Sequence, residues 1–241
     1  THMTPEPPED WIDDVSGPRP DPEAVRQLRR PGRLTDPERR RLETELALNE
    51  LLDSRRPPPL SSNFTARVLA EVARVDRLSP LFSPSRRLAL VDAAAGYLSG
   101  VRDYRGFDPR QGWRHGVAHG ADLAMQLALN PLLDKPQLDT LLRAVEAQVL
   151  ASGGHSYVFG EGERLARPVI FAARRGLHNA ADWSGWFGRI ASNATPAPGQ
   201  PTDAAALARL HNAREFIWPL YVALQEGQDA ALRERLLPGI L

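Results

Sequence analysis

Apolar residues recur every three or four positions along most of the chain, which is the spacing of one face of an α-helix. Capping residues precede these segments, and proline or glycine residues follow them, as is typical of helix ends. Pro168 and Pro219 fall inside two of the segments, where each is expected to kink or bend the helix. The pattern predicts helices over about 36–56, 62–75, 83–98, 112–130, 134–152, 160–175, 180–192 and 202–225.

A strand-like pattern is confined to residues 156–159. The predicted helices are joined by short connections, which favour antiparallel neighbours. We therefore expect an all-α fold of stacked antiparallel helix pairs around one core, either an α/α superhelix or an irregular helical bundle. Four aromatic residues near the carboxyl end recur at helical spacing and are expected in this core: Trp183, Trp186, Phe187 and Trp218.

The first part of the chain differs in composition from the rest. Residues 1–23 hold seven acids against one arginine, and residues 24–41 hold seven arginines against two acids. Proline and charge at this density are typical of an irregular segment. We expect an irregular amino-terminal arm over residues 1–31 and a single helical domain over residues 32–241. The charged arm is a candidate contact for a protein partner.

Composition excludes several classes of protein. The chain has no cysteine, which excludes disulfides, thiolate zinc sites and thiol nucleophiles. Its 30 basic and 30 acidic residues cancel, which argues against a protein that binds mainly a nucleic-acid backbone. No apolar run reaches the roughly 18 residues of a membrane helix, and no basic-then-apolar leader is present, so we expect a cytoplasmic protein without a membrane span. The glycine motifs of nucleotide sites and the G-x-S-x-G motif of serine hydrolases are also absent.

One predicted helix combines polar chemistry with apolar surroundings. Four polar residues of the helix expected over 112–130 follow one another at intervals of four, three and four positions: His115, His119, Asp122 and Gln126. On an α-helix they share a stripe about 60° wide, and Trp113 lies on the opposite face. Because the flanks of the stripe are apolar, we expect it to face a confined polar pocket.

The residues leave three interpretations of this stripe open. His115, His119 and Asp122 have the chemistry and spacing to ligate one divalent metal ion, such as zinc, manganese or iron. The same groups can supply a general base and an orienting acid. Alternatively, they are buried polar groups that neighbouring loops and Arg105 satisfy through hydrogen bonds. The zincin motif is excluded, because position 116 is glycine and not glutamate.

Two further charged segments are expected to border the same pocket. Asp103 and Arg105 directly precede the helix. Glu161, Glu163 and Arg164 open a later helix, where carboxylates suit the positive end of the dipole. The leading hypothesis is a binding module that takes a small anionic ligand or a protein partner. Its expected ligand-binding residues are Asp103, Arg105, Trp113, His115, His119, Asp122 and Arg164.

The competing hypothesis is a metal-dependent enzyme of the hydrolase type. His115, His119 and Asp122 would hold the metal ion, which lowers the pKa of a bound water. Glu163 would act as a general base, and Arg105 would stabilise developing negative charge. The candidate catalytic residues on this hypothesis are His115, His119 and Glu163.

The residues around the polar helix resemble a known family. The similarity rests on Tyr97, on Asp-Tyr-Arg-Gly-Phe at 103–107, on Gly-Trp-Arg-His-Gly-Val-Ala-His-Gly-Ala-Asp-Leu at 112–123 and on Glu-Arg-Leu at 163–165. These segments are similar to the signature of domain-of-unknown-function family 2785, over about residues 85–175. The resemblance implies an all-helical bacterial protein. Since no activity is assigned to the family, it indicates where a site lies and not which reaction takes place there.

Overall fold

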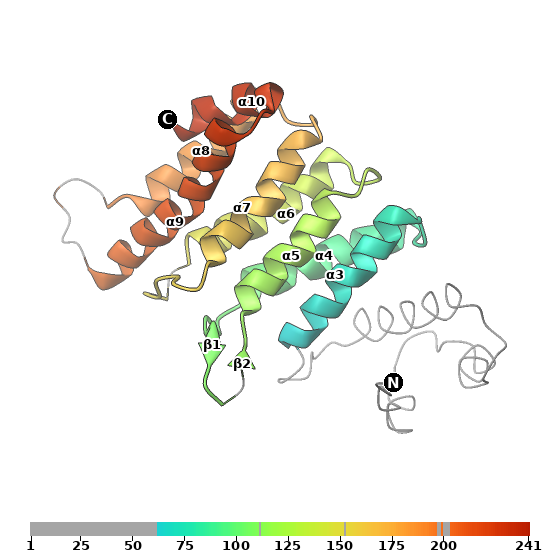
Figure 1. Ribbon diagram of the computed structural model, residues 1–241, viewed down its shortest axis with the longest axis horizontal. Coiled ribbons are helices and arrows are strands. Elements are labelled where there is room, and N and C mark those ends of the chain that lie inside the picture. The colour runs from blue at the N-terminus through green and yellow to red at the C-terminus, as the bar shows by residue number, and fades with distance from the viewer. Residues whose placement is uncertain (1–61, 111, 152, 197–198, 200–202) are drawn as a thin grey trace. The chain divides into compact units, whose positions relative to one another are not determined.

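The structure is a computed structural model that describes residues 62–110, 112–151, 153–196, 199 and 203–241 (Figure 1). All of these residues belong to one compact unit, Leu60–Leu241. The predicted arm over 1–31, the arginine-rich residues 24–41 and the predicted helix over 36–56 lie outside the described residues.

The described residues form eight α-helices and one two-stranded sheet, which confirms the predicted all-α class. The helices are α3 (Ser62–Leu78), α4 (Pro84–Gly100), α5 (Gly116–Ala128), α6 (Lys135–Val149), α7 (Glu161–Arg174), α8 (Ala180–Ala194), α9 (Ala204–Glu226) and α10 (Ala230–Ile240). The strands β1 (Phe107–Asp108) and β2 (Gly112–Trp113) pair antiparallel between α4 and α5.

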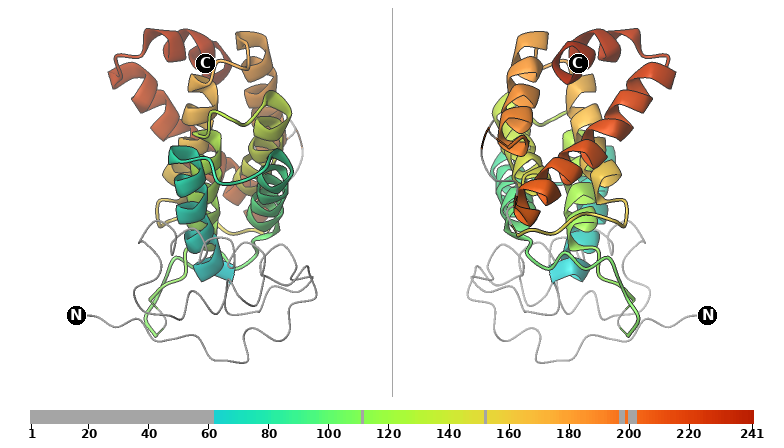
Figure 2. Two further views of the ribbon diagram at one scale, coloured as in Figure 1. Left: turned by 90° about the vertical axis from the view of Figure 1, so that its right-hand side faces the viewer. Right: turned by 90° about the vertical axis from the view of Figure 1, so that its left-hand side faces the viewer.

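The helices stack as antiparallel pairs in two layers. In one layer α3 packs on α5, α5 on α7, and α7 on α9 (Figures 1 and 2). In the other layer α4 packs on α6, and α10 packs against α8. The side chains between the two layers form the core, where large residues such as Trp183 and Phe216 are less than 2% exposed. No helix in the part of the chain that the structure describes is long and apolar enough to cross a membrane.

A buried ion pair connects the ends of three helices. Asp76 of α3 accepts hydrogen bonds from Arg87 of α4 at 2.7 Å, from the Asn130 amide beyond α5 at 2.8 Å, and from the backbone N–H groups of Leu81 and Phe82. Burial alone would raise the pKa of Asp76, but these hydrogen bonds and the charge of Arg87 outweigh it and lower the pKa. This network fixes α3 and α4 relative to the central helix α5.

Several local predictions were wrong. The helix expected over 112–130 begins at Gly116, because Gly112 and Trp113 belong to a hairpin. The strand-like residues 156–159 form no strand. Helices α7 and α9 each continue through their proline, so the expected kink or bend at Pro168 and Pro219 stays a prediction, and α10 was not predicted. Three of the four aromatic residues expected in the core are buried, but Trp218 is 66% exposed.

Candidate functional site

The β1–β2 hairpin brings the predicted site residues before α5 into one place. Asp108 begins the turn by accepting a hydrogen bond from the backbone N–H of Arg110 at 2.8 Å. Gly112 ends the turn with a φ of 73°, a left-handed conformation that glycine adopts without steric cost. The paired residues Phe107 and Trp113 then lie side by side, with their rings 5.4 Å apart.

His115 makes the sharp turn from the hairpin into α5. Its φ of 42° and ψ of 43° lie in the left-handed region, and it is the one non-glycine residue with a positive φ in the described ranges. Its backbone N–H donates to the carbonyl of Arg105 at 3.1 Å, which holds the turn against the preceding loop. The prediction that His115 shares a helical stripe with His119 was therefore wrong, because His115 caps the helix instead of lying in it.

The His115 imidazole lies in a well-defined environment. Its Nε2–H donates to the carbonyl of Phe159 at 3.1 Å and lies 3.6 Å from a carboxylate oxygen of buried Glu161. The ring packs on Trp113, with 4.8 Å between the ring centroids, and meets the His119 ring at a right angle, 6.3 Å away. The two histidines are therefore neighbours, as predicted, although by a different backbone geometry.

His119 is a half-buried imidazole surrounded by positive charge. Burial lowers its pKa to about 4, and the charges of Arg67, His115 and Arg164 act in the same direction. Its ring nitrogens have no hydrogen-bond partner among the residues of the described ranges. At neutral pH the imidazole is therefore uncharged and available to a ligand.

Asp122 lies one turn further along α5 and pairs with α7. Its two carboxylate oxygens accept hydrogen bonds from one guanidinium nitrogen of Arg164 at 2.7 and 2.8 Å. Burial raises the pKa of Asp122, and the charge of Arg164 opposes this increase without cancelling it. The ion pair ties α5 to α7 beside His119. We refer to His115, His119, Asp122, Glu161 and Arg164 as the histidine cluster.

A charged group borders the hairpin on the side of the 102–106 loop. Asp103 accepts hydrogen bonds from Arg105 at 2.6 and 2.8 Å and from Arg114 at 3.3 Å. These bonds, chiefly those of Arg105, hold the pKa of Asp103 at about 2. Arg105 also lies 3.5 Å from Asp108. The predicted residues Asp103 and Arg105 thus neutralise each other at an exposed position and brace the hairpin.

The loop between α6 and α7 places Phe159 and Glu161 in the site. Tyr157 is buried, and its hydroxyl donates to both oxygens of Gln148 at 2.9 Å, while its backbone N–H donates to Asn212 of α9 at 2.8 Å. The loop then turns back, and the N–H of Phe159 donates to Glu161 at 2.9 Å. This bonding fixes the Phe159 carbonyl at the position where it accepts from His115.

Three aromatic side chains form an exposed patch beside the histidine cluster. Phe107, Trp113 and Phe159 are 50%, 60% and 40% exposed, respectively. Trp113 packs edge-to-face against both partners, with centroid distances of 5.4 and 5.9 Å. Gly106 lies under this patch, where a Cβ would overlap the Phe159 ring. We refer to Phe107, Trp113 and Phe159 as the aromatic patch.

The structure thus brings together most of the predicted residues and separates one of them. Trp113, His115, His119, Asp122 and Arg164 are close neighbours through the ring contacts and the ion pair. Glu163, predicted as a general base, is 60% exposed and pairs with Arg167 at 2.6 Å on the surface of α7. Glu161, from the charged segment expected to border the pocket, does lie beside His115. Sequence reasoning missed Arg67 and Phe159, for which neither spacing nor a motif gives a signal.

The proposed metal ligands are engaged in other contacts. His115 donates to a carbonyl, and Asp122 is paired with Arg164. Within the described ranges, no group of three or more histidine, aspartate or glutamate side chains is arranged to hold a metal ion. Metal ligation by His115, His119 and Asp122 stays a prediction that the observed contacts do not favour.

Fold and site together define a protein of stacked helix pairs with a polar and aromatic site at the start of its central helix. The chain belongs to the family described as "Protein of unknown function (DUF2785)", whose model matches residues 61–222. The match includes the residues around the hairpin and extends well beyond the segment 85–175. No curated protein and no solved structure matches the chain.

Proposed function

We propose that this protein is a binding module that takes a small organic anion with a flat apolar part. The flat part would lie on the aromatic patch, and the acidic group would lie beside His119, between Arg67 and Arg164. The observation that carries this proposal is the aromatic patch itself, in which the exposed rings of Phe107 and Phe159 both pack on Trp113 and directly adjoin the histidine cluster.

The aromatic patch has the properties of a recognition surface. Large aromatic side chains bury 150–250 Å² each in a typical contact, and contiguous exposed apolar patches on soluble proteins often mark binding sites. Trp113 is fixed between Phe107 and Phe159, so a ligand ring would meet a rigid surface. A rigid aromatic platform loses little conformational entropy when a ligand stacks on it.

The histidine cluster supports an acidic group on the ligand. The charges of Arg67, His115 and Arg164 all act to lower the pKa of His119, so the potential at this imidazole is positive. The carboxylate of Asp122 is itself paired with Arg164. A carboxylate placed beside His119 would gain from this potential and would raise the pKa of His119.

A nuclear magnetic resonance titration with three matched probes tests the proposal. Benzoate carries both a ring and a charge, benzamide has the ring without the charge, and acetate has the charge without the ring. We expect benzoate to shift the resonances of the Trp113 indole and the His119 imidazole, to raise the pKa of His119 above about 4 and to bind more tightly than either control.

Two tryptophan variants test whether benzoate binds at the aromatic patch. Trp113→Ala is expected to weaken benzoate binding about fivefold, which corresponds to the loss of one aromatic contact. Trp218→Ala removes a tryptophan of similar exposure, 66% against 60%, and is expected to leave the affinity unchanged. The proposal is wrong if benzoate binds no better than benzamide and acetate, or if the two variants behave alike.

A further inference from the structure

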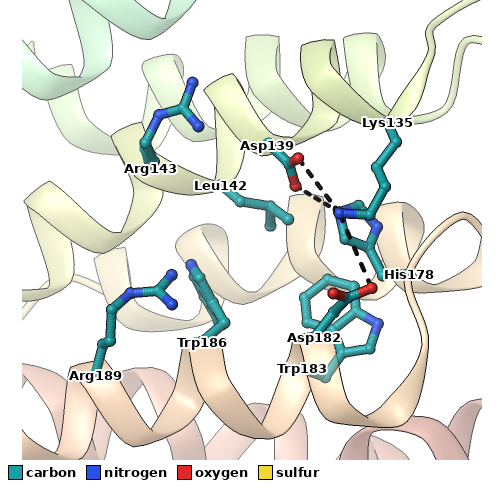
Figure 3. Close-up of a pocket in the computed structure, with 9 residues that line it drawn as sticks. All are labelled: Lys135, Asp139, Leu142, Arg143, His178, Asp182, Trp183, Trp186 and Arg189. Carbon is teal, nitrogen blue, oxygen red and sulfur yellow. Dashed lines mark hydrogen bonds and ion pairs between the residues drawn. The ribbon is translucent and has the colours of Figure 1, made fainter.

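A second cluster of polar side chains lies between α6 and α8, apart from the histidine cluster. These helices face each other across a cavity of about 220 Å³ (Figure 3). Its walls come from one face of each helix, since residues three and four positions apart point the same way. The lining from α6 includes Lys135, Asp139 and Arg143, and that from α8 includes Trp186 and Arg189.

The ammonium group and the imidazole at one end of this cavity are both paired with carboxylates. Asp139 accepts a hydrogen bond from His178 at 2.7 Å and lies 3.4 Å from the ammonium group of Lys135. Asp182 lies 3.9 Å from the same ammonium group. Two carboxylates thus face one ammonium group and one imidazole, which leaves no unpaired cationic group for an anion at this end.

The other end of the cavity carries an excess of positive charge. Arg143 donates to the hydroxyl of Thr140 at 2.9 Å and has no carboxylate within ion-pair distance among the described residues. Arg189 faces it from α8 and pairs with Glu146 at 3.2 Å. Within the described residues, only Arg189 of these two arginines is thus paired with a carboxylate, and both arginines line the cavity (Figure 3).

Trp186 lines the same end of the cavity, three positions before Arg189 on α8 (Figure 3). Its side chain is 5% exposed, and its indole nitrogen has no hydrogen-bond acceptor within the described part of the chain. In Figure 3 this nitrogen is on the side of the ring that faces α6. Buried polar groups in folded proteins are normally paired, so an unpaired N–H at a cavity wall indicates an acceptor that completes it.

We propose that this end of the cavity binds a phosphate group, with Arg143, Arg189 and the indole N–H of Trp186 as donors. A tetrahedral oxyanion accepts hydrogen bonds from several directions, which matches donors that come from two facing helices. The cavity has room for the group either as inorganic phosphate or as the end of a small phosphate monoester. This site is independent of the function proposed above, since it uses no residue of the histidine cluster or the aromatic patch.

Isothermal titration calorimetry with inorganic phosphate and with glycerol phosphate, at matched ionic strength, tests the proposal on the full chain. Binding of both compounds, or of glycerol phosphate alone, supports the site and distinguishes the two sources of the phosphate group. If neither compound binds at millimolar concentration, the proposal is overturned.

Three variants separate a phosphate site from unspecific binding. Trp186→Phe keeps an aromatic ring but removes the N–H donor, and Arg143→Gln removes the uncompensated charge; each is expected to weaken binding about tenfold. Arg74→Gln removes an exposed arginine of α3 that pairs with Glu71, and its affinity is expected to equal that of the wild type. Equal affinities for all variants would overturn the proposal, as would equal losses in the Arg143 and Arg74 variants.

Circular dichroism and thermal melting show whether each variant is folded before its affinity is measured. Trp183→Phe is a further control, because Trp183 also has a buried indole nitrogen without a partner in the described residues but lies at the end of the cavity near Asp182 and His178 (Figure 3). We expect this variant to bind phosphate like the wild type. A loss as large as that of Trp186→Phe would mean that aromatic packing, and not the N–H donor, supports binding, and would overturn the assignment of Trp186.

Discussion

Replacing Gly106 by alanine tests whether the aromatic patch depends on the contact between the 102–106 loop and Phe159. A Cβ at position 106 would overlap ring atoms of Phe159 and lie 2.8 Å from its Cβ. Because the clash reaches the root of the Phe159 side chain, rotation of the ring does not remove it. One of the two loops has to move, and the Phe159 carbonyl that accepts from His115 moves with it.

The size of the effect follows from the cost of overpacking. Forcing extra atoms into a packed contact typically costs about 1–3 kcal/mol. For a protein of this size, each kcal/mol lowers the melting temperature by about 2–4 °C. We therefore expect Gly106→Ala to melt roughly 2 to 12 °C below the wild type. We also expect it to lose benzoate binding, since the aromatic patch and His115 are displaced together.

Thermal melting followed by circular dichroism, with benzoate titrations on the same samples, measures both effects. The matched control is Gly96→Ala in α4, where a Cβ meets no atom within 4 Å. Alanine at an exposed helical position is about 0.5–1 kcal/mol more favourable than glycine, so this variant should melt slightly above the wild type. If Gly106→Ala melts like the wild type and binds benzoate equally well, the close contact with Phe159 does not shape the site.

Two further predictions concern buried ionisable groups. The pKa of His119 falls from 6.5 in the unfolded chain to about 4 in the folded protein. As the pH falls, the unfolded chain therefore binds a proton at His119 before the folded protein does. The free energy of unfolding is expected to decrease between about pH 6.5 and pH 4, by up to about 3 kcal/mol. Urea unfolding across this range should show the decrease for the wild type and a smaller one for His119→Gln; parallel curves would mean that His119 does not cause the decrease. Asp76→Asn leaves Arg87 as an unpaired buried charge and should cost about 3–5 kcal/mol in the same assay. Glu71→Gln, at an exposed ion pair, should change little, and equal effects of the two substitutions would contradict the importance of burial.

The helical fold could be predicted because its cause is local. Apolar residues at helical spacing and caps such as Asp134, whose side chain accepts from the Gln137 N–H at 3.0 Å, act within a few residues of each other. The hairpin escaped the same reasoning, since strands of two residues are too short to show a period. For Trp218 the helix was predicted correctly but the burial was not. Helical spacing with other aromatic residues does not determine which face of α9 other helices cover.

The site could be predicted only in part, for a related reason. His119 and Asp122 lie on one helix, three residues apart, so their proximity follows from the sequence. Phe159 meets His115 across 44 positions of the chain, and Arg164 meets Asp122 across 42. Such pairs depend on how α5, α7 and the connecting loops pack, which no local pattern specifies.

The backbone of His115 links the fold to the proposed function. A residue other than glycine in the left-handed region costs of order 1–3 kcal/mol, and such residues persist only where the surrounding structure compensates. Glycine, which occupies positions 112 and 160 with positive φ nearby, would make the same turn without this cost. Besides the backbone hydrogen bond to Arg105, three contacts of the imidazole offset the cost at position 115: those with the Phe159 carbonyl, the Trp113 ring and the neighbouring His119. Because all three lie in the aromatic patch or the histidine cluster, the strained turn holds the two parts of the proposed binding site together.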